Sequence, residues 1–287
     1  MNIQIEILKY IQSFRNPILN IIFLLITMST EIPVILIVVS TLYWCVNKRY
    51  GQKLMFALAT NIAVNTGVKE FVKAPRPIGT PGLKSMRVET ATGYSFPSGH
   101  TQTGTTFWVS IMSILKNKYM YIIGTIIFLG IGLSRLYLAV HWPIDVLFGW
   151  IFGIVVTILC NVILDKVEAE NNYKYFLYIV IPMTIWIFIV NSIGYVKMFG
   201  LFTGFIVGYI IEKEYVNFNI NVSIKSKIFR YIFALITLGL VYIILKVIMP
   251  DNIIGSYIRY FGLMVYAIAI APLAFNKIWK EWWFWKK

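Results

Sequence analysis

The sequence has few charged residues and few of the side chains that most enzymes use for chemistry. Only 13% of its 287 residues are charged, only 12 are acidic, and it holds two cysteines and two histidines. An ordinary soluble domain is excluded, because such domains have about 25% charged residues. Cys45 and Cys160 fall far apart in apolar runs, where they provide neither a disulfide framework nor a Cys-x-x-Cys metal spacing. We interpret them as buried packing thiols.

Hydrophobic residues make up 59% of the chain and are gathered in long runs. A helix needs about 20 residues to cross a hydrocarbon core of about 30 Å, and runs close to that length recur from end to end. The predicted fold is therefore an all-α, polytopic bundle of transmembrane helices. Residues 1–16 are amphipathic and predict an interfacial helix. We expect spans near residues 14–30, 31–47, 52–72, 101–116, 119–138, 142–164, 176–192, 198–211, 229–249 and 256–275.

The formal charge of +14 would favour a nucleic-acid partner in a soluble protein, but here most basic residues flank apolar runs. We therefore predict no nucleic-acid binding, and the lipid bilayer as the partner. If both termini are cytoplasmic, most basic residues fall on the cytoplasmic side, as the positive-inside rule requires, and the loop 77–96 lies outside. The exceptions gather on the outer side, and six of them are Lys69, Lys73, Arg76, Lys84, Arg87 and Arg135.

Three polar clusters interrupt the apolar pattern, and charged groups at membrane depth are commonly functional. The first holds Lys69 and Arg76, which lie about two helical turns apart at the end of a predicted span, with Lys73 between them. Their positive charges can therefore collect on one face. Ordinary snorkelling of these side chains towards the outer surface is the alternative interpretation.

The second cluster is the stretch Pro97-Ser98-Gly99-His100, directly before a predicted span. Ser98 suits a helix N-cap, and Gly99 lets a ligand approach the backbone. The free N–H groups in the first turn of a helix attract phosphate. The stretch thus predicts an anion site beside His100, although the same residues also suit a plain turn from loop to helix.

The third cluster is Ser134-Arg135, followed by His141 and Asp145. Pro143 suits the first turn of the next helix, so Asp145 can reach back to His141. A carboxylate that accepts one ring N–H makes the other ring nitrogen a better nucleophile or base. A buried hydrogen-bonded cap is the alternative for this pair alone. In the predicted topology all three clusters meet at one membrane face, where so few carboxylates disfavour a metal site.

Together these residues resemble the three-part signature of the type 2 phosphatidic acid phosphatase superfamily: Lys69-x6-Arg76-Pro77, then Pro97-Ser98-Gly99-His100, then Ser134-Arg135-x5-His141-x3-Asp145. The resemblance covers about residues 15–165 and implies a phosphatase core of six spans, which together with the interfacial helix takes residues 1–165. The roughly four additional spans predicted in residues 166–287 exceed this core, and the resemblance does not explain them. It implies catalytic roles for His141, His100 and Asp145, with no metal and no cofactor. The phosphate-binding residues that it implies are Lys69, Arg76, Ser98, Gly99 and Arg135.

By this resemblance, His141 attacks the phosphorus while Asp145 orients it, and His100 protonates the leaving oxygen and then activates water. The predicted function is an integral membrane phosphatase for a lipid phosphate or pyrophosphate, such as phosphatidic acid or undecaprenyl pyrophosphate. We expect it in the cell membrane, with its active site on the extracytoplasmic side. The alternatives are a phosphotransferase with an acceptor other than water, a phosphatase for a soluble sugar phosphate, and a lipid-binding or transport protein with a vestigial site.

Overall fold

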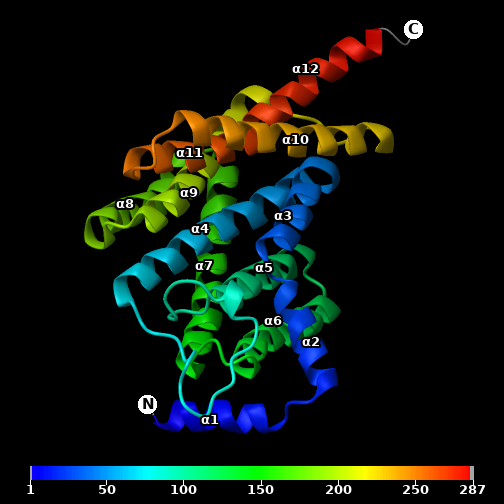
Figure 1. Cartoon of the computed structure of the whole chain (residues 1–287). Coiled ribbons are helices and arrows are strands. Elements are labelled where there is room, and N and C mark those ends of the chain that lie inside the picture. The colour runs from blue at the N-terminus through cyan, green and yellow to red at the C-terminus, as the bar shows by residue number, and fades with distance from the viewer. Residues whose placement is uncertain (1, 285–287) are drawn as a thin grey trace. The chain divides into compact units, whose positions relative to one another are not determined.

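The computed structural model describes residues 2–284, with side chains described for residues 3–277, and every regular element in this part of the chain is helical (Figure 1). The predicted all-α class is confirmed. The α-helices are α1 (Asn2–Ser13), α2 (Pro17–Met28), α3 (Ile32–Thr41), α4 (Lys48–Val72), α5 (Gly99–Leu115), α6 (Lys118–Tyr137), α7 (Pro143–Glu170), α8 (Leu177–Val190), α9 (Ile193–Ile211), α10 (Ile224–Ile248), α11 (Ile253–Val265) and α12 (Ala271–Phe284). Shorter helical turns lie at Leu42–Val46, Val88–Thr90, Tyr173–Phe176, Glu212–Val216 and Tyr266–Ile270.

Long apolar helices make the chain a membrane protein with several spans. Within the described residues, six are long and apolar enough to cross a bilayer: Lys118–Tyr137, Pro143–Glu170, Tyr173–Val190, Ile193–Val216, Ile224–Ile248 and Ile253–Lys277. Helix α5 is slightly shorter, at 17 residues, and α4 has 25 residues but carries charged residues near both ends. Helices α2 and α3 have only 12 and 10 residues. Each is shorter than the span predicted there.

The chain forms two compact units, which are described separately. Unit 1 comprises Met1–Leu36 and Val64–Asn161, and unit 2 comprises Ile37–Ala63 and Val162–Lys287. The boundaries fall inside α3, α4 and α7, so these three helices contribute to both units. Unit 2 therefore takes in residues 37–63, which the predicted domain division assigns to the phosphatase core. The division at residue 165 stays a prediction.

In unit 1, glycines bring the start of α7 against the start of α5. A Cβ atom on Gly149 would lie 2.9 Å from Cβ of Thr101, and one on Gly153 would lie 2.6 Å from Cβ of Thr105. Small residues of this kind let membrane helices approach and pack closely. Such packing is what holds them together, because lipid surroundings provide no hydrophobic driving force between helices. The close approach lets the backbone N–H of Ser98 donate to the backbone carbonyl of Asp145 at 2.9 Å. Two of the predicted clusters are thereby joined.

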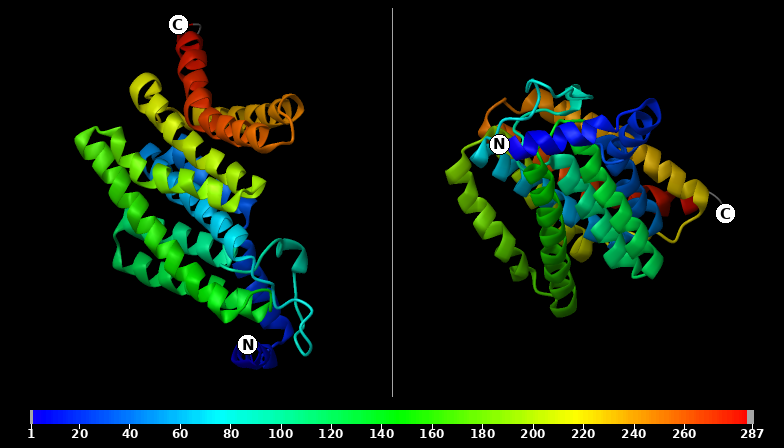
Figure 2. Two further views of the ribbon diagram at one scale, coloured as in Figure 1. Left: turned by 90° about the vertical axis from the view of Figure 1, so that its left-hand side faces the viewer. Right: turned by 90° about the horizontal axis from the view of Figure 1, so that it is seen from below.

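The N-terminal helix α1 lies beside the loop that connects α4 to α5 (Figures 1 and 2). Arg15 Nη1 donates to the carbonyl of Lys84 at 2.6 Å, Lys84 N donates to Gln12 Oε1 at 3.1 Å, and Ile144 N donates to Gln4 Oε1 at 3.2 Å. The topology that placed the N-terminus and this loop on opposite membrane faces is therefore wrong.

The connection between α2 and α3 gives the reason for this difference. Backbone hydrogen bonds of the turn type follow the end of α2, from Thr30 N to Thr27 O at 3.3 Å and from Glu31 N to Met28 O at 3.1 Å, and Ile35 N then donates to Glu31 O at the start of α3. The prediction of separate spans at 14–30 and 31–47 assumed that the chain reverses direction at this break. These bonds do not require such a reversal. Without that reversal, α1 stays on the face where α4 delivers the loop.

Candidate active site

His141 and Asp145 form a buried pair where α6 gives way to α7, and each side chain is 1% exposed. His141 Nδ1 lies 3.3 Å from Asp145 Oδ2, and Trp142 N donates to the same carboxylate oxygen at 2.8 Å. Helix α7 begins at Pro143, as predicted, which turns Asp145 back towards the imidazole. The predicted contact is present, and it leaves Nε2 as the ring nitrogen that can react.

Burial lowers the pKa of His141 well below 6.5, and the neighbouring positive charges of Arg76, Lys69 and Arg135 lower it further. The ring is therefore neutral at pH 7, so its contact with Asp145 is a hydrogen bond from Nδ1–H to the carboxylate and not an ion pair. The unprotonated Nε2 lies 2.9 Å from Arg76 Nη1, which can donate to it. A neutral imidazole of this tautomer has the lone pair that a nucleophile needs.

Ser95 also belongs to this hydrogen-bond network, and the sequence reasoning missed it. Its hydroxyl donates to Asp145 Oδ2, and its Oγ lies 3.4 Å from His141 Nδ1. The side chain is fully buried. Its backbone joins the other clusters, because Ser95 N donates to the carbonyl of Ala74 at 2.8 Å and Ser95 O accepts from Lys69 Nζ at 3.3 Å. Ser95 stands in the same stretch as Ser98, but only the path of the loop reveals which way its hydroxyl points.

Backbone carbonyls of the loop hold two of the predicted phosphate-binding cations. Arg76 donates to the carbonyls of Gly93 at 2.9 Å, Thr92 at 2.7 Å and Val140 at 3.0 Å. Lys69 Nζ donates to the carbonyl of Tyr94. These bonds fix both cations beside His141 without a carboxylate partner. Positive charge is thus concentrated beside His141.

Arg135 is the most deeply buried of the predicted cations, with 0% of its surface exposed. Its Nη1 donates to Thr27 Oγ1 on α2 at 2.6 Å, while Nε and Nη2 have no hydrogen-bond partner among the described residues. A buried cation with two unused donors is costly unless an anion joins it. Arg135 therefore indicates an anion site. Thr27 could have been suspected from the sequence only as a polar residue within an apolar helix.

The stretch Pro97 to His100 starts α5 as predicted. The Ser98 side chain accepts from Thr101 N at 3.5 Å and from Thr101 Oγ1 at 2.8 Å, which confirms the predicted N-cap. Gly99 lies beside Lys69, because a Cβ atom on this glycine would be 3.9 Å from Lys69 Cε. His100 follows on the first turn, and its imidazole ring forms no hydrogen bond with another described residue. It is free to meet a substrate oxygen.

Lys73 and the carboxylates of the loop stand apart from this arrangement. Lys73 is exposed at the end of α4, with a φ of 52°, and Glu89 is exposed on the loop. The described residues contain no group of three or more His, Cys, Asp or Glu side chains that could hold a metal ion. The absence of a metal from the reaction remains a prediction.

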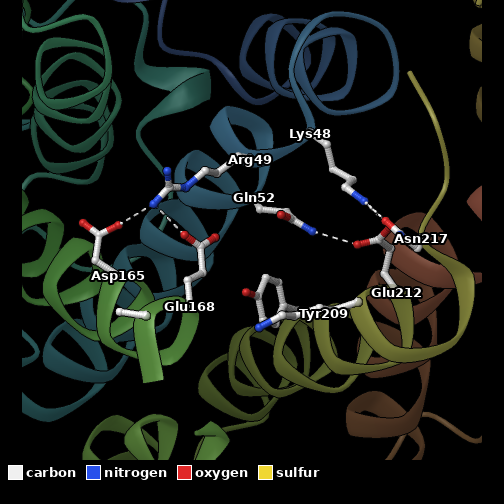
Figure 3. A pocket seen from close by; sticks show the side chains of 10 residues that line it. Lys48, Arg49, Gln52, Asp165, Glu168, Tyr209, Glu212 and Asn217 are labelled. Atoms are coloured by element: carbon white, nitrogen blue, oxygen red, sulfur yellow. Dashed lines mark hydrogen bonds and ion pairs between the residues drawn. The ribbon is translucent and has the colours of Figure 1, made fainter. Parts of the chain in front are cut away.

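A pocket in unit 2, of about 540 Å³, offers a second polar cavity (Figure 3). Its charges already neutralise one another: Glu212 accepts from Lys48 at 2.9 Å, and Arg49 pairs with Asp165 at 3.2 Å and Glu168 at 2.7 Å. These pairs join α4, α7 and the turn after α9. A phosphate could bind there only by breaking them, so the pocket is a weaker candidate than the site around His141.

Two family models match the chain. Residues 51–169 match the PAP2 superfamily, and residues 196–280 match the model described as PAP2 superfamily phosphatase, transmembrane extension. The first match contains every predicted site residue. The second covers most of the C-terminal helices, which the three sequence motifs had left unexplained.

Known relatives include an undecaprenyl-diphosphatase of Sulfolobus acidocaldarius, 30% identical over 106 residues that make up 37% of this chain and 51% of that protein. Sphingosine-1-phosphate phosphatase 1 of Rattus norvegicus is 26% identical over 46% of this chain and 32% of its own. Phosphatidylglycerophosphatase B of Bacillus subtilis is 27% identical over 54% of this chain and 79% of its own. The matches thus span about half of the first relative and a third of the second.

Among solved structures, a transmembrane PAP2 type phosphatidylglycerolphosphate phosphatase from Bacillus subtilis is 26% identical, with a TM-score of 0.48. The match covers 58% of this chain and 86% of that one.

Replacing Ser95 with alanine is expected to lower kcat/KM for phosphate release by roughly 10- to 100-fold, because a hydrogen bond to a charged group contributes about 1.5–3 kcal/mol. Ser95→Thr should restore part of the activity, since it restores a hydroxyl. Ser85→Ala is the matched control, because the Ser85 hydroxyl lies on the same loop but donates to the carbonyl of Ala139 at 2.8 Å. Equal activity in Ser95→Ala and Ser85→Ala, with equal Tm, would show that Ser95 does not position the pair.

Proposed function

The chain belongs to the PAP2 superfamily, and we propose that it is an integral membrane phosphatase that hydrolyses a lipid phosphate or pyrophosphate through a phosphohistidine intermediate. The observation that carries the proposal is the neutral, buried His141, whose partner Asp145 occupies Nδ1 while Arg76, a cation without a carboxylate partner, lies 2.9 Å from Nε2. The names of the relatives, an undecaprenyl-diphosphatase and a phosphatidylglycerophosphatase among them, support a lipid phosphate as substrate.

In the first step, His141 Nε2 attacks the phosphorus, and the bond to the leaving oxygen breaks. Arg76 Nη1 lies 2.9 Å from that nitrogen, so the guanidinium must turn from the lone pair to a phosphate oxygen when substrate binds. Asp145 keeps the Nδ1 proton in place and stabilises the positive charge that develops on the ring. The products of this step are phosphohistidine and the leaving group.

His100 transfers protons in both steps. The negative charge of the bound substrate favours the protonated ring of His100. This ring donates its proton to the leaving oxygen as the bond to phosphorus breaks, and the neutral ring then takes a proton from the water that attacks phosphohistidine. Water releases inorganic phosphate and restores His141. The position of His100 on the first turn of α5, without a hydrogen-bond partner among the described residues, leaves its ring available for this role.

Cations and helix donors stabilise the transferred phosphoryl group. Lys69, Arg76 and Arg135 balance the charge on the non-bridging oxygens, together with Ser98 and the backbone N–H of Gly99. Arg135 contributes two donors that are otherwise unused. The proposal needs no metal and no cofactor, because positive charge and proton transfer both come from side chains.

Replacing His141 with alanine should abolish phosphate release, since the nucleophile is lost. His100→Ala should instead accumulate the phosphoenzyme if the substrate has a good leaving group, because hydrolysis of phosphohistidine then lacks its base. Purified protein in detergent is assayed with a panel of lipid phosphates and pyrophosphates, and with glucose 6-phosphate as the soluble comparison. Each assay is run with and without EDTA, and acid-labile radioactive phosphate on the protein measures the intermediate.

Full activity in His141→Ala would contradict the nucleophile, and wild-type activity lost in EDTA would contradict the metal-free reaction. Lys73→Ala is the matched control for loss of a charge near the site, because Lys73 is exposed at the end of α4. It should retain most of the wild-type activity.

We propose further that the site opens to the extracytoplasmic side of the cell membrane. A single cysteine at exposed Thr92, in a chain without Cys45 and Cys160, should react with an impermeant maleimide added outside intact cells. A cysteine at Ser13 should react from the same side, because α1 is hydrogen-bonded to the loop. Asn117→Cys, in the exposed connection at the far end of α5 from His100, is the control for the opposite side. Labelling at Thr92 only after the cells are opened would reverse the orientation.

A further inference from the structure

Helix α1 has three different faces. Leu8 is fully buried. Together with partly buried Ile11 it packs against Leu136 of α6 and against Leu83 of the loop between α4 and α5, which is the site loop. Gln12 and Arg15 add hydrogen bonds to the same loop. This face attaches α1 firmly to the part of unit 1 that carries His141.

A second face of α1 is polar and exposed. It consists of Glu6, Lys9 and Ser13, spaced by three and four residues. At 3.6 residues per turn this face points roughly opposite to the buried one. A polar face in that position suits contact with water.

The third face is apolar and nevertheless exposed. Ile3 is 72% exposed, Ile7 38%, Tyr10 68% and Phe14 54%. Their spacing of four, three and four residues places them in one stripe, roughly 110° around the helix axis from the buried face. The stripe therefore faces neither the rest of unit 1 nor the direction of the polar face.

The bend between α1 and α2 indicates which surroundings the apolar stripe of α1 meets. The chain bends by 118° between the two helices, so α1 leaves the direction of α2 sharply. Helix α2 exposes a dense apolar surface, including Ile18, Ile21 and Leu25, of the kind that a membrane helix presents to lipid tails. The stripe of α1 directly precedes this surface in the sequence, at the end of unit 1 where the site lies.

We propose that α1 lies in the lipid–water interface of the leaflet that bears the active site, with Ile3, Ile7, Tyr10 and Phe14 inserted among the lipids. The polar face then meets water, and the buried face holds the site loop at the membrane surface. Such a helix has the side-chain distribution of interfacial helices, with Tyr10 at the depth that aromatic residues favour. The loop beside His141 is thereby kept at the level where a lipid head group lies.

The test measures the depth of single positions in the full-length protein, reconstituted in phosphatidylcholine vesicles. An environment-sensitive NBD fluorophore is attached to one cysteine at a time, in a chain that carries Cys45→Ala and Cys160→Ala. Tyr10→Cys and Phe14→Cys probe the stripe, and Glu6→Cys and Ser13→Cys are the matched controls on the polar face. We expect blue-shifted emission and strong quenching by spin-labelled lipids at positions 10 and 14, and little of either at 6 and 13.

Equal quenching at all four positions, or none at 10 and 14, would overturn the proposal. Disulfide-linked dimers through Tyr10→Cys without lipid quenching would also overturn it, because a second copy of the chain would then cover the stripe. The readout does not use catalysis, so its failure is distinct from a failure of the proposed phosphatase activity. Thermal unfolding of each labelled variant shows whether α1 still packs on the loop.

Discussion

Positive charge that is buried without balancing carboxylates is the constraint on which the site depends. Lys69, Arg76 and Arg135 gather around His141, and Asp145 is the carboxylate that meets this group. An ammonium or guanidinium group loses several kcal/mol of solvation when it enters such surroundings. The chain keeps these charges by giving each a different set of partners, and the incomplete set around Arg135 is where an anion fits.

The α4–α5 loop supplies most of those partners through its backbone. Carbonyls of residues 92–95 accept from Arg76 and Lys69, while the Ser95 side chain completes the His141–Asp145 pair. The loop is held in turn by α1 and by Met86 N, which donates to the carbonyl of Leu138 at 3.0 Å. One segment therefore orients both the cations and His141. Its position matters as much as the identity of the signature residues.

The sequence predicted the helical fold and the main pairings of the site, because both follow from local spacing. Apolar runs of fixed length mark membrane helices, Pro143 and Ser98 mark helix starts, and the four-residue spacing to Asp145 places its carboxylate at His141. Contacts made by the loop were not predictable in this way. Ser95 and Thr27 contact the site residues from positions far away in the sequence, and no local sequence pattern predicts such contacts.

The side of α1 was predicted wrongly for a related reason. Both a hairpin and a continuous crossing give the same apolar stretch with a break near Glu31, and counting basic residues did not distinguish them. The hydrogen bonds of Arg15 and Gln12 to Lys84 decide the matter. Amphipathicity predicted an interfacial helix but not the face on which it lies.

Phosphate binding by purified protein tests the central claim most directly. An anion that binds only the folded state stabilises it by RT ln(1 + c/Kd), where c is the anion concentration, so inorganic phosphate should raise the Tm of the wild-type protein, and above Kd the rise should grow with the logarithm of the phosphate concentration. Arg135→Gln should remove most of this rise, while Arg49→Gln, which changes a pair in unit 2, should leave it intact. No rise in the wild type, or an equal rise in Arg135→Gln, would contradict a phosphate cradle built on buried, incompletely paired cations.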